Sequence, residues 1–370
     1  MSTQTLAEQA PPSSPGRSRP EPTRIRPRAL HLADVGVVVG CAGSALALTW
    51  LLYERLAPFS GGAGFLIMWF AIFVVTYWVV IRDLEGRFIA TDKTIALVIG
   101  CVAIGLMIPL MLIVGYVILK GIKYLNLSFF TQTQAAVGPE SPATEGGGAH
   151  AIVGTLQQVG LAVIVSVPLG IGCAVYMNEV GGRMVRPVRL FVDAMSGVPS
   201  IVAGLFIFTV WILGLHQGFS GFAAALALSV LMLPTITRTS EEVLRLVPDG
   251  LREASLAVGA TQWRTTWNVV LPTARSGLVT AVILGVARAV GETAPLIMTA
   301  FGAQLMNWNP FAGAQSSLPL FVYNAYVLNT QSEVARAWTG ALVLILIVLL
   351  LFLIARAVGR KGWGTGGGQR

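Results

Sequence analysis

The chain has 370 residues, of which 55% are hydrophobic and only 11% are charged, and its mean hydropathy is +0.73. So few charged groups cannot cover a water-soluble surface of this size, which excludes an ordinary soluble protein and predicts an integral membrane protein. The formal net charge is +8, and most of the 25 lysines and arginines fall in loops assigned to one side of the membrane. This asymmetry follows the positive-inside bias and does not indicate a nucleic-acid partner.

Continuous apolar runs recur along the chain at about 20 residues, the length that a helix needs to cross a bilayer. They lack the period-two alternation that is typical of transmembrane strands. The sequence therefore predicts an all-α bundle of about eight transmembrane helices in the lipid bilayer, with both termini cytoplasmic. The expected spans are residues 32–53, 63–81, 94–119, 150–178, 190–214, 221–237, 274–301 and 337–356.

The chain divides into four parts by composition. Residues 1–31 are rich in Pro, Ser and Arg, which predicts a disordered basic cytoplasmic tail. Residues 32–93 are expected to form an accessory two-helix transmembrane hairpin, in which residues 82–93 are a cytoplasmic loop. Residues 94–356 are expected to form the main bundle, and residues 357–370 a cytoplasmic C-terminal tail.

The segment of residues 238–273, between the sixth and seventh spans, is basic and has the pattern of two short helices. Pro248 and Asp249 are start signals for the first helix, expected at residues 249–258. Gly259 then allows the chain to turn into a second helix at residues 261–270. We expect this second helix to end at Pro272, because proline breaks the hydrogen-bond ladder. The pattern predicts a compact projection on the membrane surface.

The spacing inside this segment resembles the EAA loop of ABC importer permeases. Glu253, Ala254 and Ser255 stand where that loop has Glu-Ala-Ala, with Gly259 six positions after the glutamate. Ser255 departs from the pattern by one small residue for another. The resemblance implies that the segment docks into a cleft on a separate ATPase subunit. The coupling residues that it implies are Arg252, Glu253, Ala254, Ser255, Gly259, Leu271 and Pro272.

Three further runs, at residues 195–206, 233–242 and 287–296, are similar to the phosphate-specific importer permeases of the PstA type. The resemblance covers residues 94–356 and implies a six-helix type I importer core in a bacterial cytoplasmic membrane. It also implies the partners: a homologous second permease, two copies of an ABC ATPase and an external phosphate-binding protein. ATP and Mg are then expected in the ATPase, and no cofactor, metal or catalytic residue in this chain.

Arg288 and Glu292 are charged residues deep inside the seventh expected span, four positions apart. A charge within a span is costly, about 2.5 to 3.5 kcal/mol for arginine, so it indicates a functional site. We expect both side chains on one helix face, one turn apart. Arg288 would then offer a permanent positive charge to a crossing phosphate while Glu292 competes for it. A salt bridge that only stabilises the bundle is the alternative.

Other polar residues are candidates for the same pathway. Thr293 adds a hydroxyl beside Glu292, and Arg238 lies at the inner end of the sixth span, where it either receives phosphate or anchors the helix at the surface. Ser196 and Ser200 flank a proline that is expected to break the fifth span and free backbone groups, which is tolerated beside a cavity.

Two alternatives remain open. The charged residues alone do not distinguish phosphate from sulfate, molybdate or another oxyanion. A proton-coupled secondary transporter that uses Glu292 is possible in principle, but it leaves the EAA-type spacing unexplained. A membrane enzyme is disfavoured, because no Ser-His-Asp set or paired carboxylates fall in the spans. The sequence also contains no Gly-x4-Gly-Lys-Ser/Thr loop, so the energy for transport must come from a partner or an ion gradient.

Overall fold

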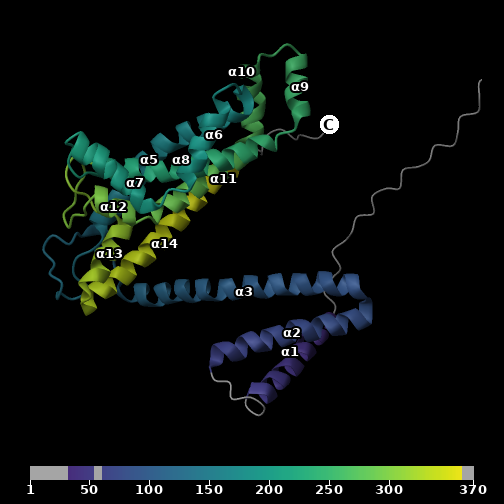
Figure 1. Ribbon diagram of the computed structural model, residues 1–370. Helices are drawn as coiled ribbons and strands as arrows, with labels where there is room; N and C mark the ends of the chain where they lie inside the picture. The colour runs from purple at the N-terminus through teal and green to yellow at the C-terminus, as the bar shows by residue number, and fades with distance from the viewer. Residues whose placement is uncertain (1–31, 54–60, 361–370) are drawn as a thin grey trace, which may run out of the picture. The chain divides into compact units, whose positions relative to one another are not determined.

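The computed structural model describes residues 32–53 and 61–360 (Figure 1). Expectations for residues 1–31 and 361–370 lie outside the described residues. Within the described part the regular elements are helical, and one isolated bridge joins Phe301 and Gln315. The α-helices are α1 (Leu32–Leu51), α2 (Gly62–Glu85), α3 (Arg87–Gly121), α4 (Leu127–Thr131), α5 (Ala149–Val175), α6 (Val185–Ser196), α7 (Ser200–Ile207), α8 (Gly221–Arg245), α9 (Asp249–Ala257), α10 (Gln262–Thr265), α11 (Leu271–Val290), α12 (Ala294–Thr299), α13 (Leu318–Leu328) and α14 (Gln331–Arg360).

Four short segments of other helical type complete the elements of the described part. A 3₁₀ turn follows α3, and three π-helical segments continue α5, α7 and α10. Their bounds are η2 (Ile122–Tyr124), η3 (Tyr176–Val180), η4 (Phe208–Gly214) and η5 (Thr266–Val270). π-Helical turns are rare and often lie at functional sites.

Seven of the described helices are long and apolar enough to cross a membrane. An eighth span results if α6 and the continuous α7–η4 helix, bent by 107°, are counted as one. The predicted all-α bundle of about eight transmembrane helices is therefore confirmed. Several bounds differ from those expected, and the differences fall where glycine, proline or ion pairs alter the ends of helices.

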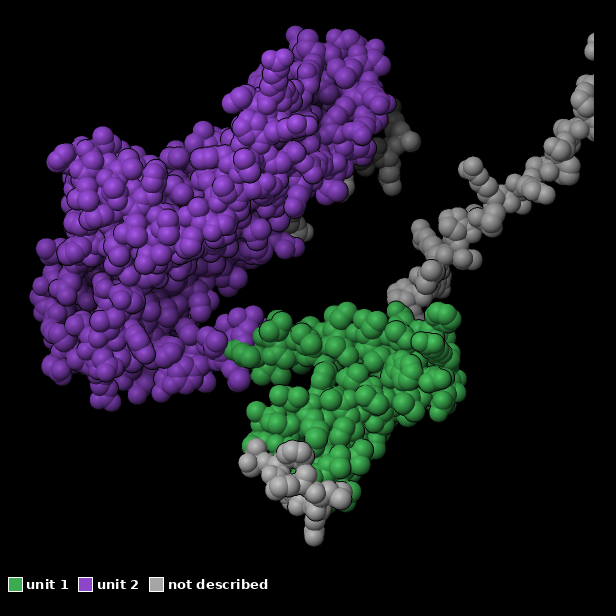
Figure 2. Space-filling model, in the orientation of Figure 1, with its two compact units in different colours: residues 1–109 green, residues 110–370 purple. Residues whose placement is uncertain are grey.

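The described chain forms two compact units, residues 1–109 and residues 110–370, coloured separately in Figure 2. In the first unit α1 packs against α2 around a small apolar core that includes Cys41, Phe73 and Tyr77. The ammonium of Lys93 lies 3.2 Å from a carboxylate oxygen of Asp34 and 2.8 Å from one of Glu85. This ion triad joins the ends of the three helices.

The loop expected at residues 82–93 is wrong, because these residues are helical apart from Gly86. α2 continues to Glu85 and α3 begins at Arg87, so that Gly86 alone separates the two helices. Gly86 has a φ of +89°, a conformation that glycine adopts readily and L-residues rarely do. α3 consequently begins seven residues before the expected span at 94–119, and the charged residues near Gly86 lie on helices.

The second unit is built around α5 and α8, which are packed along their length. α8 presents small residues to its neighbours: Ala223, Ala224, Ala225 and Ala227 are each at most 2% exposed. Further along, Ile236 lies between two glycines. A Cβ on Gly170 of α5 would be 2.9 Å from Ile236, and one on Gly285 of α11 would be 2.6 Å away. Small residues thus allow three membrane helices to approach closely.

The second unit has two ends of different structure (Figure 1). α9 and α10 project at one end, whereas α12 and α13 lie at the other. Near the start of α14 the guanidinium of Arg336, 2% exposed, pairs with Glu333 at 2.6 Å. It also donates to the carbonyls of Ser141 and Pro142 at 3.0 and 2.9 Å. This buried pair fixes the long connection between α4 and α5.

Candidate coupling segment and solute pathway

The segment at residues 238–273, here called the coupling segment, begins as a continuation of α8. The expected span ended at residue 237, but α8 extends to Arg245. Glu241 accounts for the extension, because it pairs with Arg238 three residues before it and Arg245 four residues after it. Such spacings place the partners on one helix face. The first short helix, α9, spans Asp249–Ala257 and matches the expected 249–258.

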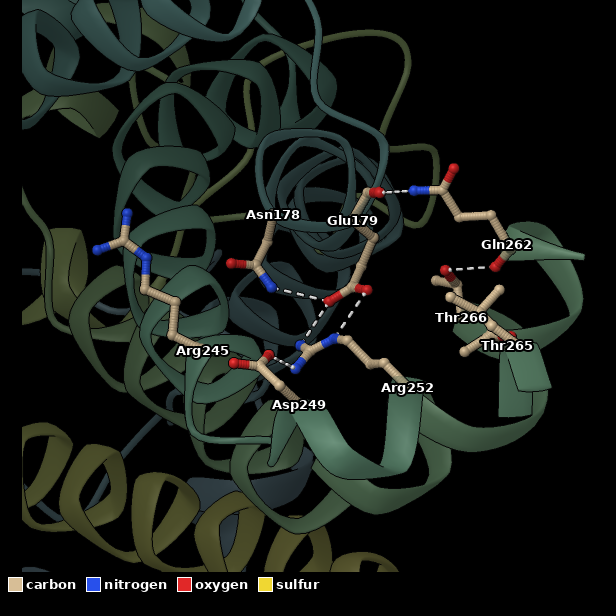
Figure 3. A pocket seen from close by; sticks show the side chains of 9 residues that line it. Asn178, Glu179, Arg245, Asp249, Arg252, Gln262, Thr265 and Thr266 are labelled. Carbon is tan, nitrogen blue, oxygen red and sulfur yellow. Dashed lines mark hydrogen bonds and ion pairs between the residues drawn. The ribbon is translucent and has the colours of Figure 1, made fainter. Parts of the chain in front are cut away.

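Arg252 on α9 is the most extensively bonded residue of the segment (Figure 3). Its guanidinium makes a two-pronged contact with Glu179 on η3, with an Nη2 to Oε1 distance of 2.8 Å and an Nε to Oε2 distance of 3.2 Å. It also donates to the carbonyls of Leu244 at 2.9 Å and Val247 at 2.6 Å. The hydrogen bond to Glu179 raises the pKa of Arg252 above its ordinary value.

The other face of α9 and α10 is open. Glu253 and Ala254 are exposed, as are Leu246 at 81% and Val258 at 85%. On the second short helix, Trp263 and Trp267 stack with ring centroids 5.5 Å apart while both remain exposed. Apolar and aromatic side chains gathered at one end of a bundle are typical of a surface that contacts another protein.

The turn between the two short helices depends on a residue without a side chain. Gly259 has a φ of +84°, and no atom lies within 4 Å of the position that a Cβ would occupy. The predicted turn at this glycine is therefore confirmed. Ser255 on α9 lies 2.9 Å from the hydroxyl of the buried Thr265 on α10. The serine that departs from the Glu-Ala-Ala pattern thus forms a hydrogen bond between the two helices.

The expected end of the second short helix at Pro272 is wrong. α10, η5 and α11 form one continuous helix from Gln262 to Val290, and Pro272 lies in the first turn of α11. The wider turns of the π-helical segment Thr266–Val270 accommodate the proline ring and its missing N–H. Leu271 packs against the buried cluster around Val270 and Leu278. The segment is therefore joined rigidly to a membrane helix.

Arg288 and Glu292 do not share one continuous helix, because the expected span at 274–301 is interrupted. α11 ends at Val290 with Gly291 as its cap, and α12 begins at Ala294. Glu292 therefore lies beyond the helix. Its Oε1 is 4.0 Å from Nε of Arg288, and the two side chains are 46% exposed for Arg288 and 20% for Glu292. This long separation leaves most donors of Arg288 available.

The break in the fifth span is confirmed and is sharper than the sequence indicated. Ser196 ends α6, where its hydroxyl donates to the Val192 carbonyl at 3.0 Å, and Ser200 begins α7. α7 packs against α12, so the two interrupted spans meet. A Cβ added to Gly204 would be 2.6 Å from Cα of Pro295. Ser200 lies four residues before one side of this contact, and Thr293 two residues before the other.

We expect Gly204→Ala to destabilise the protein by about 1 to 2 kcal/mol, because the added methyl meets backbone that cannot move aside. A lowered midpoint of thermal unfolding in detergent would report this loss. Gly160→Ala on α5 is the matched control, since no atom lies within 4 Å of its Cβ position. Equal midpoints for the two variants would contradict the close contact between α7 and α12.

Arg238 lies in a cluster of charges between α6 and α8. Glu241, 2% exposed, accepts from Arg189 at 2.6 Å, from Arg238 at 2.9 Å and from Arg245 at 2.6 Å. Arg238 also contacts Asp193 on α6. Each arginine keeps part of its side chain exposed, with 34% for Arg238. The structure therefore gives Arg238 two carboxylate partners, Asp193 and Glu241.

The family described as binding-protein-dependent transport system inner membrane component matches residues 166–362. Phosphate transport system permease protein PstA 1 of Mycobacterium tuberculosis (strain CDC 1551 / Oshkosh) is 43% identical over 254 residues, which are 68% of this chain and 83% of that protein. The chain belongs to the PstA family of transport permeases.

A second relative of the permease is PstA of Xylella fastidiosa (strain Temecula1 / ATCC 700964), 39% identical over 241 residues, 65% of this chain and 82% of that protein. A solved structure of the MetNI methionine ABC transporter in an inward-facing conformation is 22% identical, covers 58% of this chain and 94% of that chain, and has a TM-score of 0.48. By its family and its apolar helices, the permease is a multi-span protein of an inner-membrane transport family, whose members are transport subunits.

Two acidic residues of the permease, Glu179 and Glu241, organise this end of the bundle. Neither Glu179 nor Glu241 is among the site residues expected from the sequence. Both are nearly buried, with side chains 6% and 2% exposed. A signal was present for Glu179, because it stands alone at the end of a span near three arginines. An acid in that position predicts a pairing with basic residues of a neighbouring segment.

Proposed function

We propose that this chain is the transmembrane permease subunit of an ATP-driven phosphate importer and forms half of the translocation pathway. The observation that supports it best is the coupling segment itself. An exposed surface with two tryptophans projects from the bundle, and one continuous helix joins it to the span that ends near Arg288. The cargo is inferred from the relatives, which are named phosphate transport permeases.

The proposed complex contains a homologous second permease, two copies of an ABC ATPase and an external phosphate-binding protein. ATP and Mg bind the ATPase, and this chain lies in the bacterial inner membrane with both termini cytoplasmic. When ATP closes the ATPase subunits, the coupling segment moves, and α11 and α8 transmit the motion to the pathway. This scheme assigns ATPase contact to Glu253, Ala254 and the exposed tryptophans, and loop shape to Arg252, Ser255 and Gly259.

Arg288 is the proposed phosphate contact in the membrane. Its guanidinium is a planar, permanently charged donor suited to phosphate oxygens, and its side chain is 46% exposed in the single chain. Glu292 competes for it at 4.0 Å, which favours transient binding over capture. Transient binding suits a transporter, because a site that holds phosphate tightly would not release it. The neighbouring helix breaks are proposed to be lined by Thr293, Ser196 and Ser200. Arg238 is proposed to line the cytoplasmic exit of the pathway.

The test is ATP hydrolysis by the co-expressed complex in lipid, with the binding protein loaded in turn with phosphate, sulfate and molybdate. We expect stimulation by the phosphate-loaded protein alone. Stimulation by another oxyanion would keep the permease assignment and change the cargo. If no ATPase copurifies with the chain, the assignment of the coupling segment is wrong, and a proton-coupled transporter using Glu292 becomes the explanation to test.

A further inference from the structure

Glu179 contacts both short helices of the coupling segment. Its carboxylate binds Arg252 of α9 through two hydrogen bonds, of 2.8 and 3.2 Å. Its main-chain carbonyl accepts a hydrogen bond from the side-chain amide of Gln262 on α10. Asn178 donates to the same carboxylate at 2.8 Å. One nearly buried residue at the end of the α5–η3 helix therefore holds α9 and α10 together (Figure 3).

Arg252 is held by a second membrane helix at the same time. Its Nη2 and Nη1 groups donate to the carbonyls of Leu244 and Val247, at the C-terminal end of α8, and Nη1 also bonds Asp249 at 3.1 Å. Carbonyls at a helix C-terminus lack helical partners and attract cations. The guanidinium therefore joins α5, α8 and α9 at one point.

We propose that Glu179 is a positioning residue that fixes the coupling segment to α5 and α8, so that a displacement of α9 is passed to these two helices. The inference rests on the proposed function, because the displacement comes from the ATPase. A two-pronged arginine–carboxylate pair fixes orientation as well as distance. α5 and α8 form the centre of the second unit, so movement at Arg252 reaches the packed core directly.

The coupling ratio of the full complex tests this role. Glu179→Gln keeps the side-chain size and leaves the main-chain carbonyl for Gln262. We expect about threefold less phosphate transported per ATP hydrolysed in proteoliposomes, because the bonds to Arg252 lose their charge assistance. Arg252→Gln should have a similar effect, and the double variant should lose no more than either single variant. Glu242→Gln, which changes an exposed acid on α8, should couple like the unchanged complex.

Amide hydrogen exchange gives a second measurement that does not depend on the cargo. In the purified complex without ATP or phosphate, Glu179→Gln should speed exchange at residues 249–257 about tenfold, the factor expected for loss of a charged hydrogen bond. Unchanged exchange would overturn the positioning role. Faster exchange with an unchanged coupling ratio would show that Glu179 is only a structural contact. That result would also overturn the positioning role. If the complex with the unsubstituted permease transports no phosphate, the proposed function is wrong. Amide hydrogen exchange would then still test the contact between Glu179 and Arg252.

Discussion

Arg288→Gln is expected to reduce phosphate uptake by about tenfold or more, because glutamine offers a neutral amide where phosphate would meet a permanent charge. The side chain is accessible in the single chain and its nearest carboxylate is 4.0 Å away. The substitution therefore removes a solute contact and breaks no tight ion pair. Uptake of labelled phosphate by proteoliposomes containing the full complex is the measurement.

The control for this variant is Arg275→Gln, which removes an exposed arginine at the other end of α11. It should leave uptake unchanged. Arg288→Gln should leave copurification of the ATPase unchanged, because Arg288 is remote along α11 from the coupling segment. Normal uptake by Arg288→Gln would show that this residue does not contact the solute and that the pathway has to be sought on other side chains.

Gly259→Val is expected to weaken assembly with the ATPase by about 1 to 3 kcal/mol, the range for a residue forced into a sparsely populated backbone region. The φ of +84° at this position is unfavourable for any β-branched side chain. The valine side chain itself meets open space, so the effect comes from the backbone. The measurement is the amount of ATPase retained on the immobilised permease over a range of ATPase concentrations.

Two further substitutions separate backbone strain from loss of a glycine as such. Gly259→Asn should retain most of the assembly, because asparagine tolerates positive φ better than other L-residues. Gly250→Val lies in α9 at an ordinary helical φ with open space around it, and it should cost much less than Gly259→Val. Equal losses for the two valine variants would contradict the requirement for a left-handed turn.

The span count and the first short helix of the coupling segment could be predicted because each depends on local signals. Apolar length predicts a span, and Pro248, Asp249 and Gly259 mark the ends of α9. The ends of the long apolar helices were predicted less well. At Gly86 the sequence favoured a loop, yet one residue with positive φ is enough to separate α2 from α3. At Pro272 the sequence favoured the end of a helix, yet the helix is continuous there, because a π-helical segment precedes the proline.

Within the coupling segment, local backbone geometry could be predicted from sequence spacing, whereas contacts between distant segments could not. Gly259 has the predicted role in chain geometry, because its backbone conformation is local. The partner of Arg252 was not predictable from spacing, since Glu179 lies 73 residues away. The same holds for Arg189, 52 residues from Glu241. Arg288 and Glu292 had the right separation for a helical pair, but α11 ends between them, at Val290 with Gly291 as its cap.

The close packing of α8 has a consequence for how this protein tolerates change. The alanines at its start and Ile236 between two glycines leave no room for larger side chains, whereas α3 exposes most of its apolar residues. In a library of all single substitutions selected for growth on limiting phosphate, enlargements along α8 should be depleted throughout. Variants with one apolar residue replaced by another along α3 should be retained. The sequence of α3 can therefore vary during evolution, whereas the packed positions of α8 are restricted to small residues.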